Sequence, residues 1–207
     1  MSTFHILEEA FAKHTMPKEI QEVIIEKQNQ TSLKTLLAKY HITSLWHFTD
    51  RSNISSIKKH GILSLANLKK KDIDISHTAS SELSHNIDIL KRLDHYVHLS
   101  FIQDHPLYHV AISEKRLVDP VWIEIDISIL FDKKTRFCDQ VANKKGAKIL
   151  SVDKIEKVID FDIMLYSKDF DQRKEVRKAE VLIADYIPVD KIIGVHDGKK
   201  TYIHPTW

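Results

Sequence analysis

The spacing of apolar residues divides the chain into two parts. In residues 1–40, Phe4, Leu7 and Phe11 fall on one face at helical spacing, and Thr31 is placed to cap a further short helix. We interpret this segment as an N-terminal helical extension. It either packs as a helical layer on the rest of the protein or forms a docking surface for a partner.

From residue 41 the apolar pattern becomes strand-like, most clearly in the alternation at 121–125. Helices are expected at 51–60 and 106–111, whereas the polar stretch 69–94 is either a mobile loop or a short helix. Because helices come mostly first and strands dominate later, residues 41–207 are predicted to form one α+β domain with a mostly antiparallel sheet. The expected strands are 45–48, 96–101, 121–125, 148–152, 157–163, 179–183 and 191–195, with an edge strand at 201–204.

The composition limits the class of protein but does not identify a binding partner. The 207 residues are 43% hydrophobic, enough for a sizeable core. The net charge of +2 does not mark a nucleic-acid binder, although a local basic patch is sufficient for a short single strand. Cys138 is the only cysteine, which excludes an intrachain disulfide and fits a reducing compartment. With no membrane-spanning apolar run and no signal-peptide pattern, we expect a cytoplasmic protein that does not bind membranes.

Three short segments place a polar side chain among apolar ones. His47 lies in LWHFT, His98 in YVHLSF and Glu180 in RKAEVL, and each segment has the pattern of a strand. A buried polar group needs a partner or a function. From the residues alone, a histidine satisfied in the core and a glutamate that faces solvent remain open alternatives.

In this order, the three segments resemble the DarT family of nucleic-acid ADP-ribosyltransferases, toxins that transfer ADP-ribose from NAD to a base. The resemblance covers about residues 42–195, so the N-terminal extension lies outside it. It implies the ADP-ribosyltransferase fold, in which a split, mostly antiparallel sheet holds NAD in a cleft. NAD is then a co-substrate, and no metal is expected.

The resemblance assigns candidate catalytic and NAD-binding residues. Transfer breaks the bond between nicotinamide and ribose, and a carboxylate beside the ribose stabilises the positive charge that develops. Glu180 is implied as this carboxylate. The family arginine that precedes the second strand corresponds to Arg92, with His85 or Lys91 as the alternative. The implied NAD-binding residues are His47, Thr49, Asn53 and Gly61, with Tyr108 or His98 beside the nicotinamide, although a core role is an equal alternative for these last two.

The stretch 160–177 corresponds to the family's substrate-recognition loop. It mixes aromatic rings, which stack on bases, with cations, which pair with phosphates. A solvated charged loop is the alternative. The residues implied in substrate binding are Tyr166, Lys168, Phe170, Arg173, Lys174 and Arg177.

The sequence therefore predicts an NAD-dependent enzyme that modifies single-stranded DNA or, as the close second, RNA. The resemblance also implies a toxin–antitoxin or anti-phage context, with an antitoxin of the macrodomain type or another kind as partner. Transfer to protein, NAD hydrolysis and a non-catalytic nucleotide-binding module are the alternatives. A zinc site at His105 and His109 is not supported, because no third ligand has a diagnostic spacing.

Overall fold

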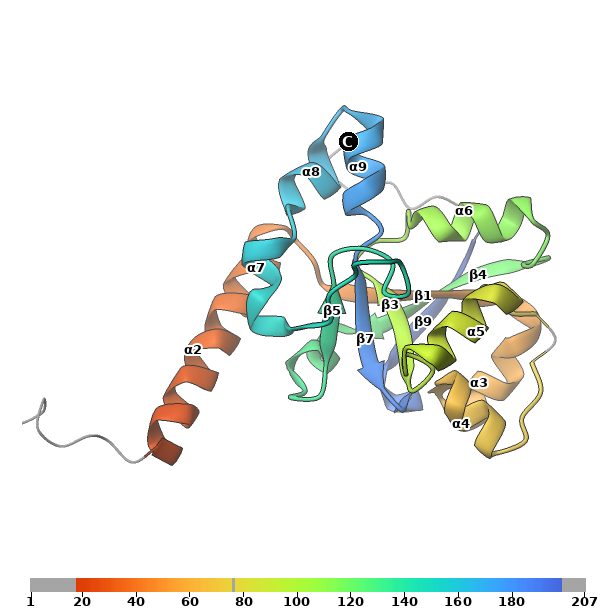
Figure 1. The fold of residues 1–207 in the computed structure, drawn as a ribbon, viewed down its shortest axis with the longest axis horizontal. Helices are drawn as coiled ribbons and strands as arrows, with labels where there is room; N and C mark the ends of the chain where they lie inside the picture. Colours follow the sequence, from red (N-terminus) through yellow and green to blue (C-terminus); the bar gives the residue numbers. More distant parts are fainter. Residues whose placement is uncertain (1–17, 76, 199–207) are drawn as a thin grey trace, which may run out of the picture.

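The computed structural model describes residues 18–75 and 77–198, and its centre is a seven-stranded sheet (Figure 1). The strand order is β6-β5-β7-β3-β1-β4-β9, and every neighbouring pair is antiparallel. The predicted α+β class with an antiparallel sheet is therefore confirmed. The strands are β1 Ser44–Asp50, β3 Tyr96–Ser100, β4 Pro120–Asp126, β5 Arg136–Cys138, β6 Leu150–Ser151, β7 Glu180–Ala184 and β9 Ile192–Asp197.

The sheet is split between its two central strands. β1 pairs with β4 over its whole length, from Ser44 opposite Asp126 to Asp50 opposite Pro120. Its pairing with β3 is a single position, Trp46 opposite Ser100. Beyond that position the two strands diverge and leave backbone groups and side chains of both free to line a cavity. This is the split sheet that the resemblance implied.

Several predicted elements have different bounds or a different type. The expected strand 157–163 is wrong, because this segment contains α7 Ile155–Val158 and α8 Phe161–Tyr166. Asp160 starts α8 by accepting a hydrogen bond from the Ile163 amide at 2.9 Å, and this local cap overrides the apolar pattern. The expected strand 148–152 is reduced to β6, and β5 had not been predicted.

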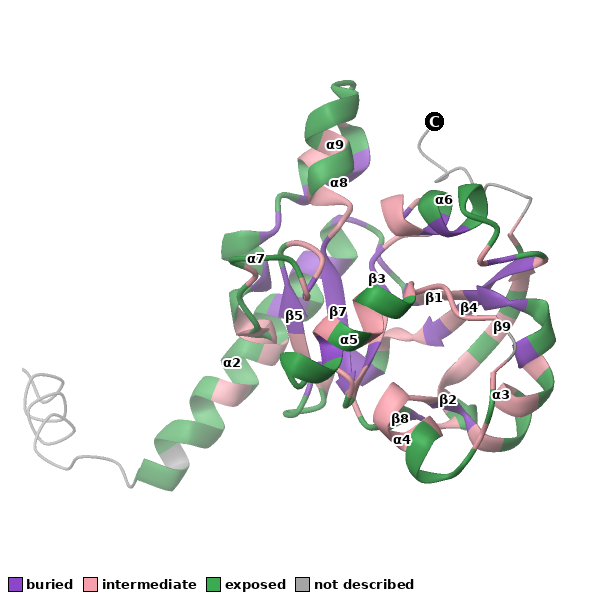
Figure 2. Ribbon diagram, turned by 45° about the vertical axis from the view of Figure 1, so that its right-hand side comes forward, coloured by how far each residue is buried: buried purple, intermediate pink, exposed green. Residues whose placement is uncertain are grey.

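The first described helix is α2, Lys18–Lys39. It is one continuous helix, so the separate helix capped by Thr31 is a wrong prediction: the Thr31 hydroxyl instead donates to the Lys27 carbonyl one turn earlier, at 2.9 Å. Leu33 and Leu37 lie in the main hydrophobic core. Val23 and Ile25 are exposed on the half that projects from the body (Figure 2). The docking interpretation of this exposed half stays a prediction, and Phe4, Leu7, Phe11 and the expected strand 201–204 lie outside the described residues.

Short helices surround the split in the sheet. η1 Arg51–Asn53 and α3 Ile54–His60 follow β1 and correspond to the predicted helix 51–60. The polar stretch 69–94 contains the end of α4 Leu65–Lys70 and all of α5 Glu82–Leu90. α6 Pro106–Ser113 corresponds to the predicted helix 106–111. The remaining elements are the small sheet of β2 Ile62–Leu63 with β8 Tyr186–Ile187, the helix α9 Phe170–Val176, and the 3-10 turns η2 Ile127–Phe131, η3 Val152–Lys154 and η4 Val189–Lys191.

The core explains why these elements pack where they do. Leu45, Leu99, Ile123 and Val181 point to one face of the sheet, where the end of α2, α7 and α8 cover them. Aromatic side chains from β1, β4 and α6 form a second cluster. Among the described helices, none is both long and apolar enough to span a bilayer.

Candidate active site

A cavity of about 370 Å³ opens where β1 and β3 separate, within the size range of ligand pockets. Side chains from β1, α3, α5, β3, α6 and β7 line it. Six of the eight predicted catalytic and NAD-binding residues are among them: His47, Thr49, Asn53, Gly61, His98 and Glu180. The structure thus brings together residues that are up to 133 positions apart, since 180 − 47 = 133. Their individual roles stay predictions.

Glu180 is the first residue of β7 and its side chain is buried. Its Oε2 accepts hydrogen bonds from His98 Nδ1 at 3.0 Å and from the Ala142 amide at 2.9 Å. The two side chains meet because β3 and β7 pair antiparallel, with His98 opposite Leu182 and Ser100 opposite Glu180. The solvent-facing alternative for Glu180 is therefore wrong.

The two partners hold each other in the charged state. Burial alone raises the pKa of Glu180, but the His98 charge and its hydrogen bond lower the pKa below the ordinary value. Burial likewise lowers the pKa of His98, and the Glu180 carboxylate raises it above the ordinary value. The result is a fixed carboxylate in the wall of the cavity.

His47 lines the cavity as a neutral ring. Burial lowers its pKa to about 4, and its Nδ1 lies 3.1 Å from the His98 carbonyl oxygen. A neutral ring that donates from Nδ1 to a carbonyl keeps Nε2 as an acceptor. His47 is therefore suited to accept from a hydroxyl group, not to pair with a phosphate.

Asn53 ties three segments of the cavity wall together. Its Nδ2 donates to Thr49 Oγ1 at 3.0 Å and to the His77 carbonyl at 2.8 Å. Gly61 ends α3 with φ 74°, a conformation that favours glycine. A Cβ at this position would lie 2.2 Å from the Ile187 carbonyl oxygen. Strand β8 can therefore pack this close to the end of α3 only because residue 61 is a glycine.

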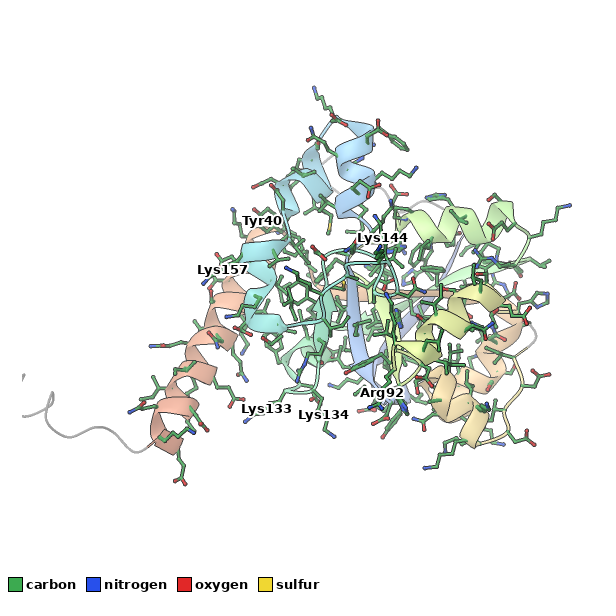
Figure 3. All side chains as sticks on the ribbon, viewed as in Figure 1. Tyr40, Arg92, Lys133, Lys134, Lys144 and Lys157 are labelled. Atoms are coloured by element: carbon green, nitrogen blue, oxygen red, sulfur yellow. The ribbon has the colours of Figure 1, made fainter. Side chains whose placement is uncertain are left out.

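Arg92 does not line the cavity. It is exposed in the turn after α5, with φ 58°, and it lies at the lower edge of the view in Figure 3. Of the alternatives, His85 lines the cavity, whereas the Lys91 ammonium donates to the carbonyls of Asn143 and Lys144. The structure thus offers no support for Arg92 as the catalytic arginine, because Arg92 is exposed and does not line the cavity that holds Glu180.

Arg116 is the cation that sequence reasoning missed. It follows α6 and is the only lysine or arginine among the described cavity-lining residues. Its Nε donates to Glu114 Oε2 at 2.8 Å, and its Nη1 is buried with no hydrogen-bond partner in the described part of the chain. Nothing in the local sequence marks Arg116, because only the folding of α6 over the end of β1 brings it to the cavity.

Tyr108 also lies outside the cavity lining. Its hydroxyl donates to the Gly198 carbonyl at 2.6 Å, and its ring packs on Trp122 with 4.7 Å between centroids. This is the core role that the sequence left open. Within the residues that the structure describes, no three His, Cys, Asp or Glu side chains gather as a metal site.

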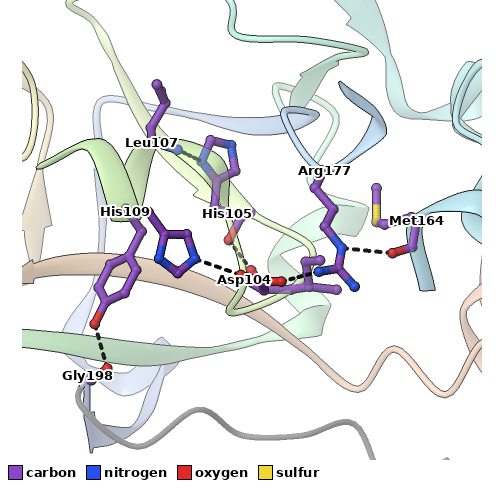
Figure 4. A network of polar contacts seen from close by, with 10 residues as sticks. Asp104, His105, Leu107, His109, Met164, Arg177 and Gly198 are labelled. Carbon is purple, nitrogen blue, oxygen red and sulfur yellow. Dashed lines mark hydrogen bonds and ion pairs between the residues drawn. The ribbon is translucent and has the colours of Figure 1, made fainter. Parts of the chain in front are cut away.

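The stretch 160–177 forms α8 and α9, which rise from the sheet above the start of β7 (Figure 1). None of its six predicted substrate-binding residues lines the cavity. Arg177 is held in a polar network, shown in Figure 4: its Nε donates to the Met164 carbonyl at 2.9 Å, and Nη1 pairs with Asp104, which also binds His109 Nε2 at 2.7 Å. Arg173 Nη1 donates to the Ser167 carbonyl at 2.8 Å.

The other predicted substrate-binding residues of this stretch are exposed. Phe170 and Tyr166 are exposed aromatic residues, and the Lys174 ammonium lies 6.0 Å from the centre of the Phe170 ring. Lys168 is exposed as well. Their part in substrate binding stays a prediction.

Comparison with known proteins identifies the family. No curated protein matches the sequence. The family model described as "ssDNA thymidine ADP-ribosyltransferase, DarT" matches residues 46–201.

Among solved structures, Thermosipho africanus DarTG in complex with ADP-ribose is similar, with a TM-score of 0.59 and 21% identity. The match covers 74% of this chain and 43% of that chain, so it spans less than half the length of that protein. Thermus sp. 2.9 DarT in complex with ADP-ribosylated ssDNA has a TM-score of 0.58 and 15% identity over 75% of this chain and 81% of that one. The same Thermus protein in complex with NAD+ has a TM-score of 0.53 and 16% identity over 74% of this chain and 81% of that one. These likenesses establish the fold, and the family model, which covers most of the chain, establishes that the protein belongs to the DarT family of NAD-dependent ADP-ribosyltransferases.

Proposed function

We propose that this protein transfers ADP-ribose from NAD to thymine in single-stranded DNA, and that the cavity at the split of the sheet is its active site. The observation that carries the proposal is Glu180, a buried carboxylate kept ionised by His98 and the Ala142 amide in a cavity wall. A fixed negative charge of this kind stabilises the positive ribose of the transition state without rearrangement.

The charges around the cavity fit two parts of NAD. The Glu180 carboxylate makes one part of the wall acidic, which suits the positive nicotinamide ribose. Arg116 supplies a cation with a free Nη1, which suits the diphosphate. We therefore propose that Arg116, in place of Arg92, contacts the diphosphate, and that His47 accepts a hydrogen bond from a ribose hydroxyl.

The surface of α8, α9 and their connection is the proposed contact for the DNA. We propose that Tyr166 and Phe170 stack on bases and that Lys168, Arg173 and Lys174 pair with phosphates. α9 leads directly into the Glu180 strand, so a base bound there is near the cavity.

The proposed context is a toxin with its own antitoxin. One similar structure bears the name DarTG, and this chain matches 43% of its length. We propose that an antitoxin, of the macrodomain type or of another kind, acts on this protein.

The test is transfer of label from NAD to polymer. The protein is incubated with NAD labelled in the adenosine half and with single-stranded DNA or RNA oligonucleotides that contain or lack thymine or uracil. Labelled DNA that depends on thymine is expected. Labelled RNA alone, labelled protein alone, or only free ADP-ribose would overturn the proposal in favour of an RNA-modifying, a protein-modifying or a hydrolytic enzyme.

The matched variants for this test are Glu180→Gln and Glu19→Gln. Losing a preorganised electrostatic group costs about 10²- to 10³-fold in rate, so E180Q is expected to lose transfer by that factor. Glu19 is exposed in the first turn of α2, and E19Q is expected to behave as wild type. If E180Q keeps near-normal turnover, Glu180 is not the catalytic carboxylate.

A further inference from the structure

A second buried carboxylate, Asp88, lies in the wall of the same cavity. α5 turns Ser84, His85 and Asp88 toward the cavity, and Asp88 is only 4% exposed. Its Oδ1 has no hydrogen-bond partner in the described ranges. A buried carboxylate oxygen without a partner costs stability, so its presence in a cavity wall points to a function.

The groups around Asp88 separate its chemistry from that of Glu180. Burial raises the pKa of Asp88 and the Glu180 charge adds to this, while His98, Asn143 and His85 offset part of the rise. The pKa of Glu180, in contrast, is lowered by His98. Two carboxylates whose environments push their pKa values apart are suited to different tasks. His98 holds Glu180 in the charged form, whereas burial favours uptake of a proton by Asp88.

We propose that Asp88 is the proton acceptor for the base that receives ADP-ribose, an inference that rests on the proposed function. Besides the nitrogen bonded to its sugar, thymine has one ring nitrogen, N3, and this nitrogen carries a hydrogen. A bond forms between N3 and C1 of the nicotinamide ribose, and the bond from this C1 to nicotinamide breaks. The bond's electron pair leaves with nicotinamide, which becomes neutral. The N3 proton passes to the Asp88 carboxylate and later to water, so charge and atoms balance.

The position of Asp88 supports this division of tasks. Glu180 already accepts two hydrogen bonds and is held in place to face the ribose. Asp88 comes from a different element, α5, and has an oxygen with no partner. In this arrangement Glu180 faces the positive charge that develops on the ribose. Asp88 faces the N3–H group of the thymine that approaches the ribose.

The experiment compares Asp88→Asn with the control Glu82→Gln. Glu82 is an exposed carboxylate on the same helix and does not line the cavity. Loss of a general base costs about 10²- to 10⁴-fold, so D88N is expected to lose transfer to a thymine oligonucleotide by such a factor. NAD affinity by calorimetry and slow NAD hydrolysis should be kept, because water adds to the positive ribose without prior deprotonation. E82Q should match wild type in transfer, in NAD affinity and in NAD hydrolysis.

A second acceptor makes the test specific for proton transfer. Replacing the thymine by 5-fluorouracil makes the N3–H more acidic, so its proton leaves with less help from a base. The ratio of the rates on 5-fluorouracil and on thymine should therefore rise in D88N relative to wild type, and raising the pH should rescue D88N more than wild type. A purely structural role for Asp88 would change neither quantity.

The outcomes separate this inference from the function on which it rests. If the wild-type protein labels thymine and D88N does so within a few-fold, or with an unchanged acceptor ratio, Asp88 is not the proton acceptor while the proposed function stands. If D88N loses NAD binding and hydrolysis together with transfer, Asp88 shapes the cavity and the inference is overturned. If the wild-type protein labels no base, the proposed function and this inference fall together.

Discussion

Removing His98 is the most direct test of how the Glu180 carboxylate is kept in place. In His98→Ala, Glu180 keeps only the Ala142 amide as a partner and becomes a buried charge without its counter-ion. Breaking a buried ion pair by removing one partner costs about 3–5 kcal/mol. Because the side chains of His98 and Glu180 are 29% and 7% exposed, we expect a loss near the lower end of that range, about 3 kcal/mol.

The matched control is His109→Ala. His109 Nε2 lies 2.7 Å from Asp104, a distance similar to the 3.0 Å of the His98–Glu180 pair, but the two control side chains are 57% and 46% exposed. An exposed ion pair contributes about 0–1 kcal/mol. Urea unfolding at neutral pH, followed by circular dichroism, therefore compares a buried pair with an exposed pair, whose Asp104 also keeps Arg177 as a partner in H109A.

The pH dependence of the difference between wild type and H98A follows from the two pKa shifts. The folded-state pKa of His98 is raised, so its contribution is complete below the unfolded value of 6.5 and is lost as pH rises through the folded pKa. The pKa of Glu180 is lowered, so its contribution is complete above the unfolded value of 4.5 and is lost as pH falls through the folded pKa. The cost of H98A should be largest between these two values and smaller on either side. Equal losses in H98A and H109A, or a loss in H98A that does not vary with pH, would refute the reasoning.

Three further predictions concern other parts of the cavity and its surroundings. Gly61→Ala should lower the free energy of unfolding by about 1–3 kcal/mol, because the added Cβ meets the Ile187 carbonyl and the backbone has φ 74°; an unchanged urea midpoint would contradict this. His47→Ala should weaken NAD binding in calorimetry by the same factor on either side of pH 6.5, because a pKa of about 4 keeps the ring neutral, and unchanged affinity would make His47 a core residue only. The double variant Tyr166→Ala and Phe170→Ala should lower transfer to DNA by about 5- to 150-fold for each stacked base, while NAD hydrolysis stays the same. The exposed Tyr186→Ala is its control, and equal losses of transfer and hydrolysis in the double variant would mean that α8 and α9 support the cavity instead of binding DNA.

The strands that build the proposed active site were visible in the sequence because each is a short apolar run with one polar residue. β1, β3 and β7 were expected within one or two residues of their observed bounds, and so were the positions of His47, His98 and Glu180 on them. Local signals were sufficient for this, since strand period and turn residues depend on near neighbours. Where a local cap competed with the apolar pattern, as at Asp160 before α8, the prediction of a strand was wrong.

What lies around those strands was decided by tertiary structure. The pairing of His98 with Glu180 depends on the register between β3 and β7, and the opening of the cavity depends on β1 and β3 meeting at a single position. Arg92 is close in sequence to the cavity-lining Asp88 but is exposed and does not line the cavity. Arg116 and Asp88, in contrast, reach the cavity only through the packing of α6 and α5. The sequence by itself determined which strands carry the candidate site residues His47, His98 and Glu180. Only the fold determined which charges face them, because distances between charges, and therefore pKa values, are set by contacts between segments far apart in the chain.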